Sequence, residues 1–269
     1  MFVGWVRENS FVKDLENFSK KVLLDIYLIQ KAKEKGIIFA SYKGDEMCGI
    51  ITGIVFAKTI FIHNFAYLQE MKDEDKKRLI AIFLKNLSHT NSEKTILLLA
   101  KKEEYPLFLE AGFEVYGDFS KAIYQGGAVF NFSNSMSKSI NNDNYKQIIK
   151  LVDFVAFNED RYEYILDNIK HSSLILSTRF GYMHSYGLDT NMIKLSPWIV
   201  DSGAFDDAEK LLRGVIYHRG LKNLIAFIPT NISEIKELYE NYNFKFESGY
   251  KLLYKNEKPN INMEMVYGF

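Results

Sequence analysis

The chain has 269 residues, 47% hydrophobic and 25% charged, which is enough for one large domain or two of ordinary size. Its 34 basic and 34 acidic residues cancel, which argues against a nucleic-acid partner because phosphate contacts need a basic surface. The single cysteine, Cys48, excludes an intrachain disulfide, and the histidines lack the spacing of a metal site. No stretch has the apolar length of a membrane span or a signal peptide. The sequence therefore predicts a cytoplasmic protein without metal, nucleic-acid or membrane partners.

The first part of the chain alternates segments typical of strands and helices. Strands are indicated by runs of Ile, Val and Phe, and helices by apolar residues three and four apart. The expected elements are a strand at 2–7, a helical region at 11–35, strands at 37–42, 48–57 and 59–65, a helix at 73–87, a strand at 95–100, a helix at 105–111 and a strand pair from 113 to about 132.

A polar stretch separates this part from a second one of the same order. Residues 133–144 are rich in serine and asparagine and predict a linker. The expected elements that follow are a helical region at 145–169, broken near 158–160, strands at 173–179, 182–186 and 192–200, a helix at 206–218, a strand at 224–229, a helix at 232–242 and a strand at 245–254. We therefore expect two α/β domains, at 1–132 and 145–269.

The stretch from Asn231 to Phe244 is the clearest pattern in the chain. An apolar face and a capping residue, Asn231, predict an amphipathic helix, and strand-like runs flank it. A fainter copy occupies 105–113, between the strand at 95–100 and the strand that begins near 114. An echo at this spacing indicates internal duplication.

These motifs resemble the GCN5-related N-acetyltransferase (GNAT) family in a tandem arrangement. The family's late helix often carries an asparagine, then Leu-Tyr-Glu, then Gly-Phe. Asn231, Leu238–Glu240 and Phe244 match this pattern, with Asn243 in place of the glycine. The end of the pattern recurs in Leu107–Phe113. The resemblance implies two α/β domains, each with a mostly antiparallel sheet flanked by helices.

The resemblance also implies a reaction, the transfer of an acyl group from acetyl-CoA or another acyl-CoA to a small-molecule or protein amine. The family holds the pyrophosphate on backbone N–H groups at a helix start that is rich in glycine. Neither half keeps these glycines. Carboxylates stand there instead, at Asp73, Glu74 and Asp75 in one half and at Asp206 and Asp207 in the other. They complement the helix dipole but repel a phosphate. The alternative hypothesis is thus a non-catalytic GNAT-fold protein that binds a ligand or partner in a regulatory or structural role.

We expect one working site, in the second half, while the first half, with His63 and Asn64 at a strand end, stays open as an alternative. Tyr239 matches the position from which the family returns a proton to the departing thiolate. A pKa of about 10 suits that role, although the side chain also lies on the apolar stripe. The residues expected to bind the acyl carrier are Trp198, Ile199, Val200, Ser202, Gly203, Ala204, Phe205, Ala208, Arg213 and Asn231. The acceptor, the acyl length and the oligomeric state have no signature in the sequence.

Overall fold

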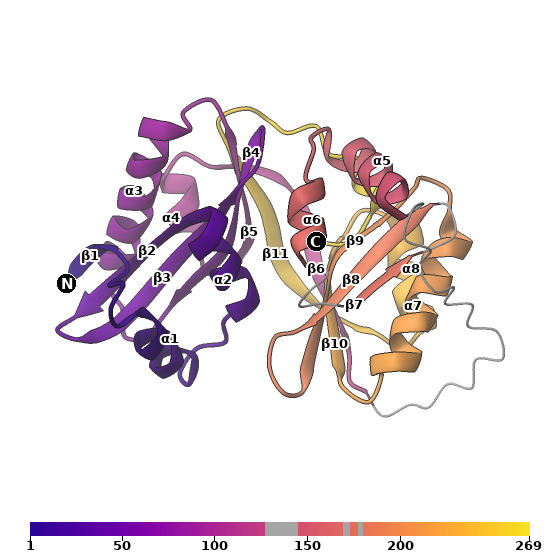
Figure 1. Ribbon diagram of the computed structural model, residues 1–269, viewed down its shortest axis with the longest axis horizontal. Helices are drawn as coiled ribbons and strands as arrows, with labels where there is room; N and C mark the ends of the chain where they lie inside the picture. Colours follow the sequence, from indigo (N-terminus) through magenta and orange to yellow (C-terminus); the bar gives the residue numbers. More distant parts are fainter. Residues whose placement is uncertain (127–144, 169–172, 177–179) are drawn as a thin grey trace. The chain divides into compact units, whose positions relative to one another are not determined.

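The computed structural model describes residues 1–126, 145–168, 173–176 and 180–269 (Figure 1). Two compact units emerge. Unit 1 is Met1–Tyr116 with Lys251–Pro259, and unit 2 is Gly117–Tyr250 with Asn260–Phe269. Across those four ranges, no helix combines the length and the apolar character that a membrane crossing requires. The expected linker, 133–144, lies outside the described residues.

Unit 1 is a mixed sheet with helices packed on it. Its strands follow the order β1-β2-β3-β4-β5-β11, antiparallel from β1 to β4 and parallel between β4 and β5. The elements are β1 (Phe2–Trp5), α1 (Phe11–Ser19), α2 (Ile26–Lys35), β2 (Gly36–Lys43), β3 (Glu46–Val55), β4 (Thr59–Tyr67), α3 (Asp73–Thr90), β5 (Thr95–Lys101), α4 (Tyr105–Glu110) and the last part of β11 (Lys245–Lys255).

The helical region expected at 11–35 is two helices, α1 and α2. The side chain of Asp25 accepts a hydrogen bond from the backbone N–H of Leu28, 3.1 Å away, so a new helix starts there. The predicted stripe of α3 is buried as expected. Leu79 and Phe83 are fully covered, and the Phe83 ring meets the edge of Phe39 on β2. Burial of such side chains is the main stabilising contribution of the unit.

In unit 2 the strands follow the order β11-β6-β10-β9-β8-β7, with antiparallel and parallel pairs, and a short strand, β12, pairs with β9 off this path. The elements are β6 (Glu114–Tyr124), α5 (Tyr145–Phe157), α6 (Tyr162–Asn168), β7 (Ser173–Leu176), β8 (Gly181–Gly187), β9 (Met192–Val200), α7 (Phe205–Arg219), β10 (Asn223–Pro229), α8 (Ser233–Asn241), η1 (Met263–Met265) and β12 (Val266–Gly268). No element is expected from the sequence after 245–254, so η1 and β12 are new.

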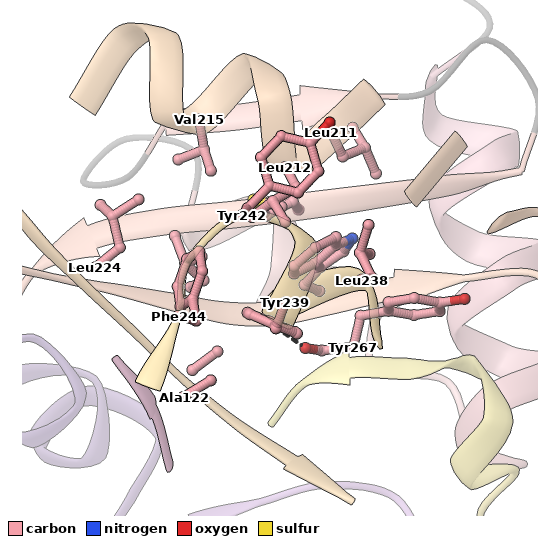
Figure 2. Packing of buried hydrophobic residues seen from close by; sticks show 14 of the residues in the cluster. Ala122, Leu211, Leu212, Val215, Leu224, Leu238, Tyr239, Tyr242, Phe244 and Tyr267 are labelled. Carbon is pink, nitrogen blue, oxygen red and sulfur yellow. Dashed lines mark hydrogen bonds between the residues drawn. The ribbon is translucent and has the colours of Figure 1, made fainter. Parts of the chain in front are cut away.

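The core of unit 2 lies between α7, α8 and the sheet. Figure 2 shows Leu211, Leu212 and Val215 of α7 in the same packed group as Leu238 and Tyr239 of α8. The predicted helical stripes therefore mark the buried faces. The predicted break near 158–160 is also confirmed, because Asn158 has a left-handed backbone (φ 53°) that α5 cannot continue through. The predicted class, mixed α/β sheets flanked by helices in two units, is confirmed.

The units do not coincide with the predicted boundaries at 132 and 145. The final strand of the first repeat, β6, pairs with β10 in unit 2, from Phe119 opposite Pro229 to Tyr124 opposite Leu224. The final strand of the second repeat, β11, has its last residues in unit 1, where Leu253 is part of the core. Each repeat thus gives the end of its last strand to the other unit. Local periodicity shows that a strand exists but not which sheet it joins.

Candidate active site

In each unit, two parallel strands pair over their first residues and then continue apart. In unit 1, Thr59–Ile62 of β4 pair with Thr95–Leu98 of β5. In unit 2, Met192–Lys194 of β9 pair with Asn223–Ile225 of β10. Beyond the pairing, backbone N–H and C=O groups along the separated edge need other partners. An extended ligand with amide groups can supply them, as a peptide does when it adds a strand to a sheet.

The outer hydrogen bonds show which backbone groups face the separated edge. The N–H of Leu68 donates to the C=O of Cys48 at 2.8 Å, so the backbone groups of Leu68 face β3. Alternate residues of a strand point their N–H and C=O groups to opposite sides, so those of Phe65 and Tyr67 face away from β3. The corresponding bond of unit 2 joins the N–H of Asp201 to the C=O of Phe180 at 2.6 Å. By the same alternation, Trp198 and Val200 turn theirs away from β8.

In unit 2 this edge is already occupied by the chain itself. Val266 of β12 lies opposite Ile199 and Gly268 lies opposite Trp198, in antiparallel pairing. On the other side, the N–H of Phe269 donates to the C=O of Phe227 on β10 at 2.9 Å. The residues from Val266 to Phe269 thus lie between the two separated strands.

Tyr239 is part of this arrangement. Its side chain is 0% exposed, and its hydroxyl donates to the backbone C=O of Tyr267 at 2.6 Å, the dashed line in Figure 2. The ring packs against Trp198 and meets the edge of the Phe244 ring. Burial raises the pKa of Tyr239 well above its ordinary value. The hydroxyl therefore holds β12 in place, and its catalytic role stays a prediction.

The expected acyl-carrier residues fall into three groups. Trp198, Ile199 and Val200 are fully buried, and β12 lies along them. A loop of small residues precedes α7, in which the exposed Ser202 accepts a hydrogen bond from the side-chain amide of Asn262 at 3.3 Å. In the same loop, Gly203 is exposed with φ 78° and Ala204 is the half-buried N-cap of α7. The third group lies further along the chain: Phe205 and Arg213 are half-buried on α7, Ala208 of α7 is buried in the core, and Asn231 is exposed.

Asn231 does not cap the late helix. The cap position of α8 is Ile232, without a side-chain hydrogen bond, and the helix begins at Ser233. The capping prediction was wrong because the chain enters the helix one residue later than the pattern indicates. Ile232 instead packs against the core from the side.

In unit 1 the separated edge begins at a β-bulge. The register of β3 and β4 shifts between Thr52, opposite Asn64, and Gly53, opposite Ile62, so His63 is the extra residue. The side chain of Asn64 is structural: its amide donates to the Thr52 hydroxyl at 3.2 Å, and its oxygen accepts from the N–H of Asp25 at 3.1 Å. Bulges of this kind are common beside active sites, where they turn a strand edge outward.

Titratable groups gather where β4 and β5 end. Glu104 is buried, its carboxylate accepts from the N–H of Lys101 at 3.0 Å, and burial raises its pKa to about 7. Burial and the negative charge of Glu104 raise the pKa of Tyr67 to about 12. The Lys76 ammonium lies 4.2 Å from the centre of the Tyr67 ring and 2.9 Å from the Asp73 carboxylate. This end of unit 1 thus holds proton-exchanging groups beside the ammonium groups of Lys76 and Lys101.

The late-helix tyrosine has no counterpart in unit 1. Phe108 of α4 stands at that position, fully buried, with its ring against Phe65 and Phe113. Phenylalanine has no hydroxyl and therefore cannot act as a general acid. The helix start of α3 is as acidic as expected, with Asp73, Glu74 and Asp75 in its first turn.

Paired α/β units with separated parallel strands define the class: the chain has the GNAT fold, in tandem. No protein-family model matches the chain, and no curated protein matches it. Solved structures do. A candidate acetyltransferase from Pyrococcus horikoshii superposes with a TM-score of 0.78 at 15% identity, over 100% of this chain and 93% of that one.

Two further structures share the arrangement. A tandem GNAT protein from the clavulanic acid biosynthesis pathway has a TM-score of 0.55 at 10% identity, covering 83% of each chain. A GNAT-family acetyltransferase from Colwellia psychrerythraea has a TM-score of 0.54 at 13% identity, over 96% of this chain and 100% of that one. At these identities the likeness establishes the fold, and activity must be argued from the site.

Proposed function

We propose that the chain is an acyl-CoA-dependent N-acyltransferase whose site lies where β4 and β5 separate in unit 1. One observation carries this proposal. Among the described residues, no third strand lies between β4 and β5, whereas β12 takes the matching edge of β9. The amide groups of the carrier arm would pair with the backbone of Phe65 and Tyr67, next to the bulge at His63.

The reaction needs a proton acceptor and a proton donor. The amine nitrogen attacks the thioester carbonyl, a C–N bond forms, the C–S bond breaks and the sulfur leaves as a thiolate. The amine must lose a proton, and the thiolate must gain one. Since Phe108 has no hydroxyl, we assign these roles in unit 1 to Glu104 and Tyr67. The Glu104 carboxyl, with a pKa of about 7, is partly ionised near neutral pH and can accept the proton of the amine. The Tyr67 hydroxyl, with a pKa of about 12, is protonated at neutral pH and can donate its proton to the thiolate.

Thermal unfolding with and without acetyl-CoA tests the proposal. A ligand at 100 times its dissociation constant adds about 2.7 kcal/mol to the stability of the state that binds it. We expect acetyl-CoA and coenzyme A to raise the unfolding temperature, and ATP, the control for phosphate binding alone, to leave it unchanged. A chain that no acyl-CoA stabilises at millimolar concentration would contradict the proposal.

A second candidate function is a non-catalytic GNAT-fold module that binds a ligand or partner. The observation that favours it is the acidic start of α3, since Asp73, Glu74 and Asp75 oppose a pyrophosphate at that helix end. For this candidate we expect no stabilisation by acetyl-CoA and no release of free thiol from acetyl-CoA in the presence of amines.

A further inference from the structure

The segment Asn260–Phe269, called here the closing segment, contacts the loop before α7 and both separated strands of unit 2. Its Asn262 side chain donates to Ser202 in the loop before α7, and the Asn262 N–H donates to the C=O of Ala156 on α5 at 2.8 Å. Its strand β12 pairs with β9, and Phe269 bonds to β10. One short segment thus covers the loop, the strand edge and the gap between the strands.

The closing segment is packed as a core element. Met265 and Val266 are 0% exposed, and the Tyr267 ring lies 5.4 Å from the Trp198 ring. The centre of the Phe269 ring lies 5.4 Å from the centre of the Phe119 ring on β6 and 6.2 Å from that of the Phe157 ring on α5. These contacts bury the closing segment in the interior of unit 2.

The pairing is close enough to require glycine at one position. A Cβ atom at Gly268 would lie 2.4 Å from the backbone oxygen of Leu195 and 3.2 Å from the Cβ of Trp198. No real side chain tolerates a 2.4 Å contact with backbone, so any residue other than glycine would push β12 away from β9.

We propose that the closing segment occupies the place on β9 where an acyl-carrier arm would pair, and so holds unit 2 closed to CoA thioesters. The backbone groups of Trp198 and Val200 that face β12 are those that an amide-bearing arm would use. One edge cannot pair with both at once. This inference concerns unit 2 and stands apart from the function proposed for unit 1.

Amide hydrogen exchange on the full chain tests this closure, with acetyl-CoA as the probe. Gly268→Ala displaces β12, so we expect exchange within 196–200 to become about tenfold faster or more, and millimolar acetyl-CoA to slow it again. Gly187→Ala is the matched control, since a Cβ there meets its nearest atom, the backbone oxygen of Asp189, at 3.6 Å. It should leave exchange in 196–200 as in the wild type.

Faster exchange that acetyl-CoA does not slow would overturn the proposal, because the opened edge would then not take a carrier. If Gly268→Ala leaves exchange unchanged, a chain that stops after Glu264 decides. Protection of 196–200 by acetyl-CoA in that chain supports closure. Loss of folding, or no protection, makes residues 265–269 an ordinary core strand and refutes it. Exchange within 63–67 reports unit 1 separately in the same samples, so failure of one proposal is distinguishable from failure of the other.

Discussion

Replacing Tyr239 with phenylalanine removes one hydroxyl from the core of unit 2 and keeps the ring. In the native chain that hydroxyl donates to the C=O of Tyr267 at 2.6 Å, and the two residues are 0% and 3% exposed. Without the donor, the carbonyl loses a partner in a place that water does not reach. Such a loss costs about 1–3 kcal/mol. Because 1 kcal/mol shifts the unfolding temperature of chains near this size by about 2–4 °C, we expect a fall of about 2–12 °C.

Urea and thermal unfolding of the wild type, of Tyr239→Phe and of a control variant measure this loss of stability. The control is Tyr217→Phe, on α7 of the same unit, where the side chain is 60% exposed. We expect the control to remain within about 0.5 kcal/mol of the wild type. If Tyr239→Phe unfolds together with the wild type and the control, the hydroxyl does not hold the closing segment and the energetic argument fails. Because the proposed site lies in unit 1, we expect Tyr239→Phe to leave the acyl-transfer rate per folded molecule unchanged, and a slower rate would support a catalytic role for Tyr239.

Three further predictions concern buried charge. Asp153→Asn removes the carboxylate that the buried Arg161 guanidinium contacts at 2.6 and 3.0 Å, while the negative charge of Glu159 remains; it should cost about 3–5 kcal/mol in urea unfolding, and a change below about 1 kcal/mol would show that the pair is solvated. Burial lowers the pKa of His184 to about 3, so between about pH 6.5 and 3 the unfolded chain takes up this proton and the folded chain does not. Stability should therefore fall, as the pH drops below 6.5, by up to about 1.4 kcal/mol per pH unit, and His184→Gln should flatten the plot of stability against pH between about pH 6.5 and 5. Burial raises the pKa of Glu104 to about 7, so the folded chain keeps this proton above pH 4.5, where the unfolded chain loses it. Stability should therefore fall as the pH rises from about 4.5 to about 7, and an equal fall in Glu104→Gln would show that this carboxyl is not the cause.

The helices and most strands could be predicted because their apolar faces have a clear period. The stripes of α3 and α7 are buried as the spacing indicates, with Leu79 and Phe83 in one core and Leu211 and Leu212 in the other. The break between α1 and α2 was missed, since apolar residues continue through a point where Asp25 starts a new helix. Strand partners were also missed, because β6 and β11 join their sheets through long-range pairing that no local pattern encodes.

The carrier site expected in unit 2 stays a prediction. The sequence pattern selects Trp198, Ile199 and Val200, and these residues lie on β9 beyond its pairing with β10, where β12 pairs with Trp198 and Ile199. The pattern gives no sign of what covers that edge, since β12 is too short to show a period. The one available signal was Gly268 between two aromatic residues, which is consistent with a close backbone approach.

Amide exchange of the wild-type chain, with and without acetyl-CoA, tests most directly where a carrier binds. We predict that acetyl-CoA slows exchange within 63–67, on the separated edge of β4, and leaves exchange within 196–200, which β12 covers, unchanged. Slowing within 196–200 and not within 63–67 would place the carrier in unit 2 and contradict both the proposed site and the closing segment. No slowing in either stretch would contradict the acyltransferase proposal and favour the non-catalytic module.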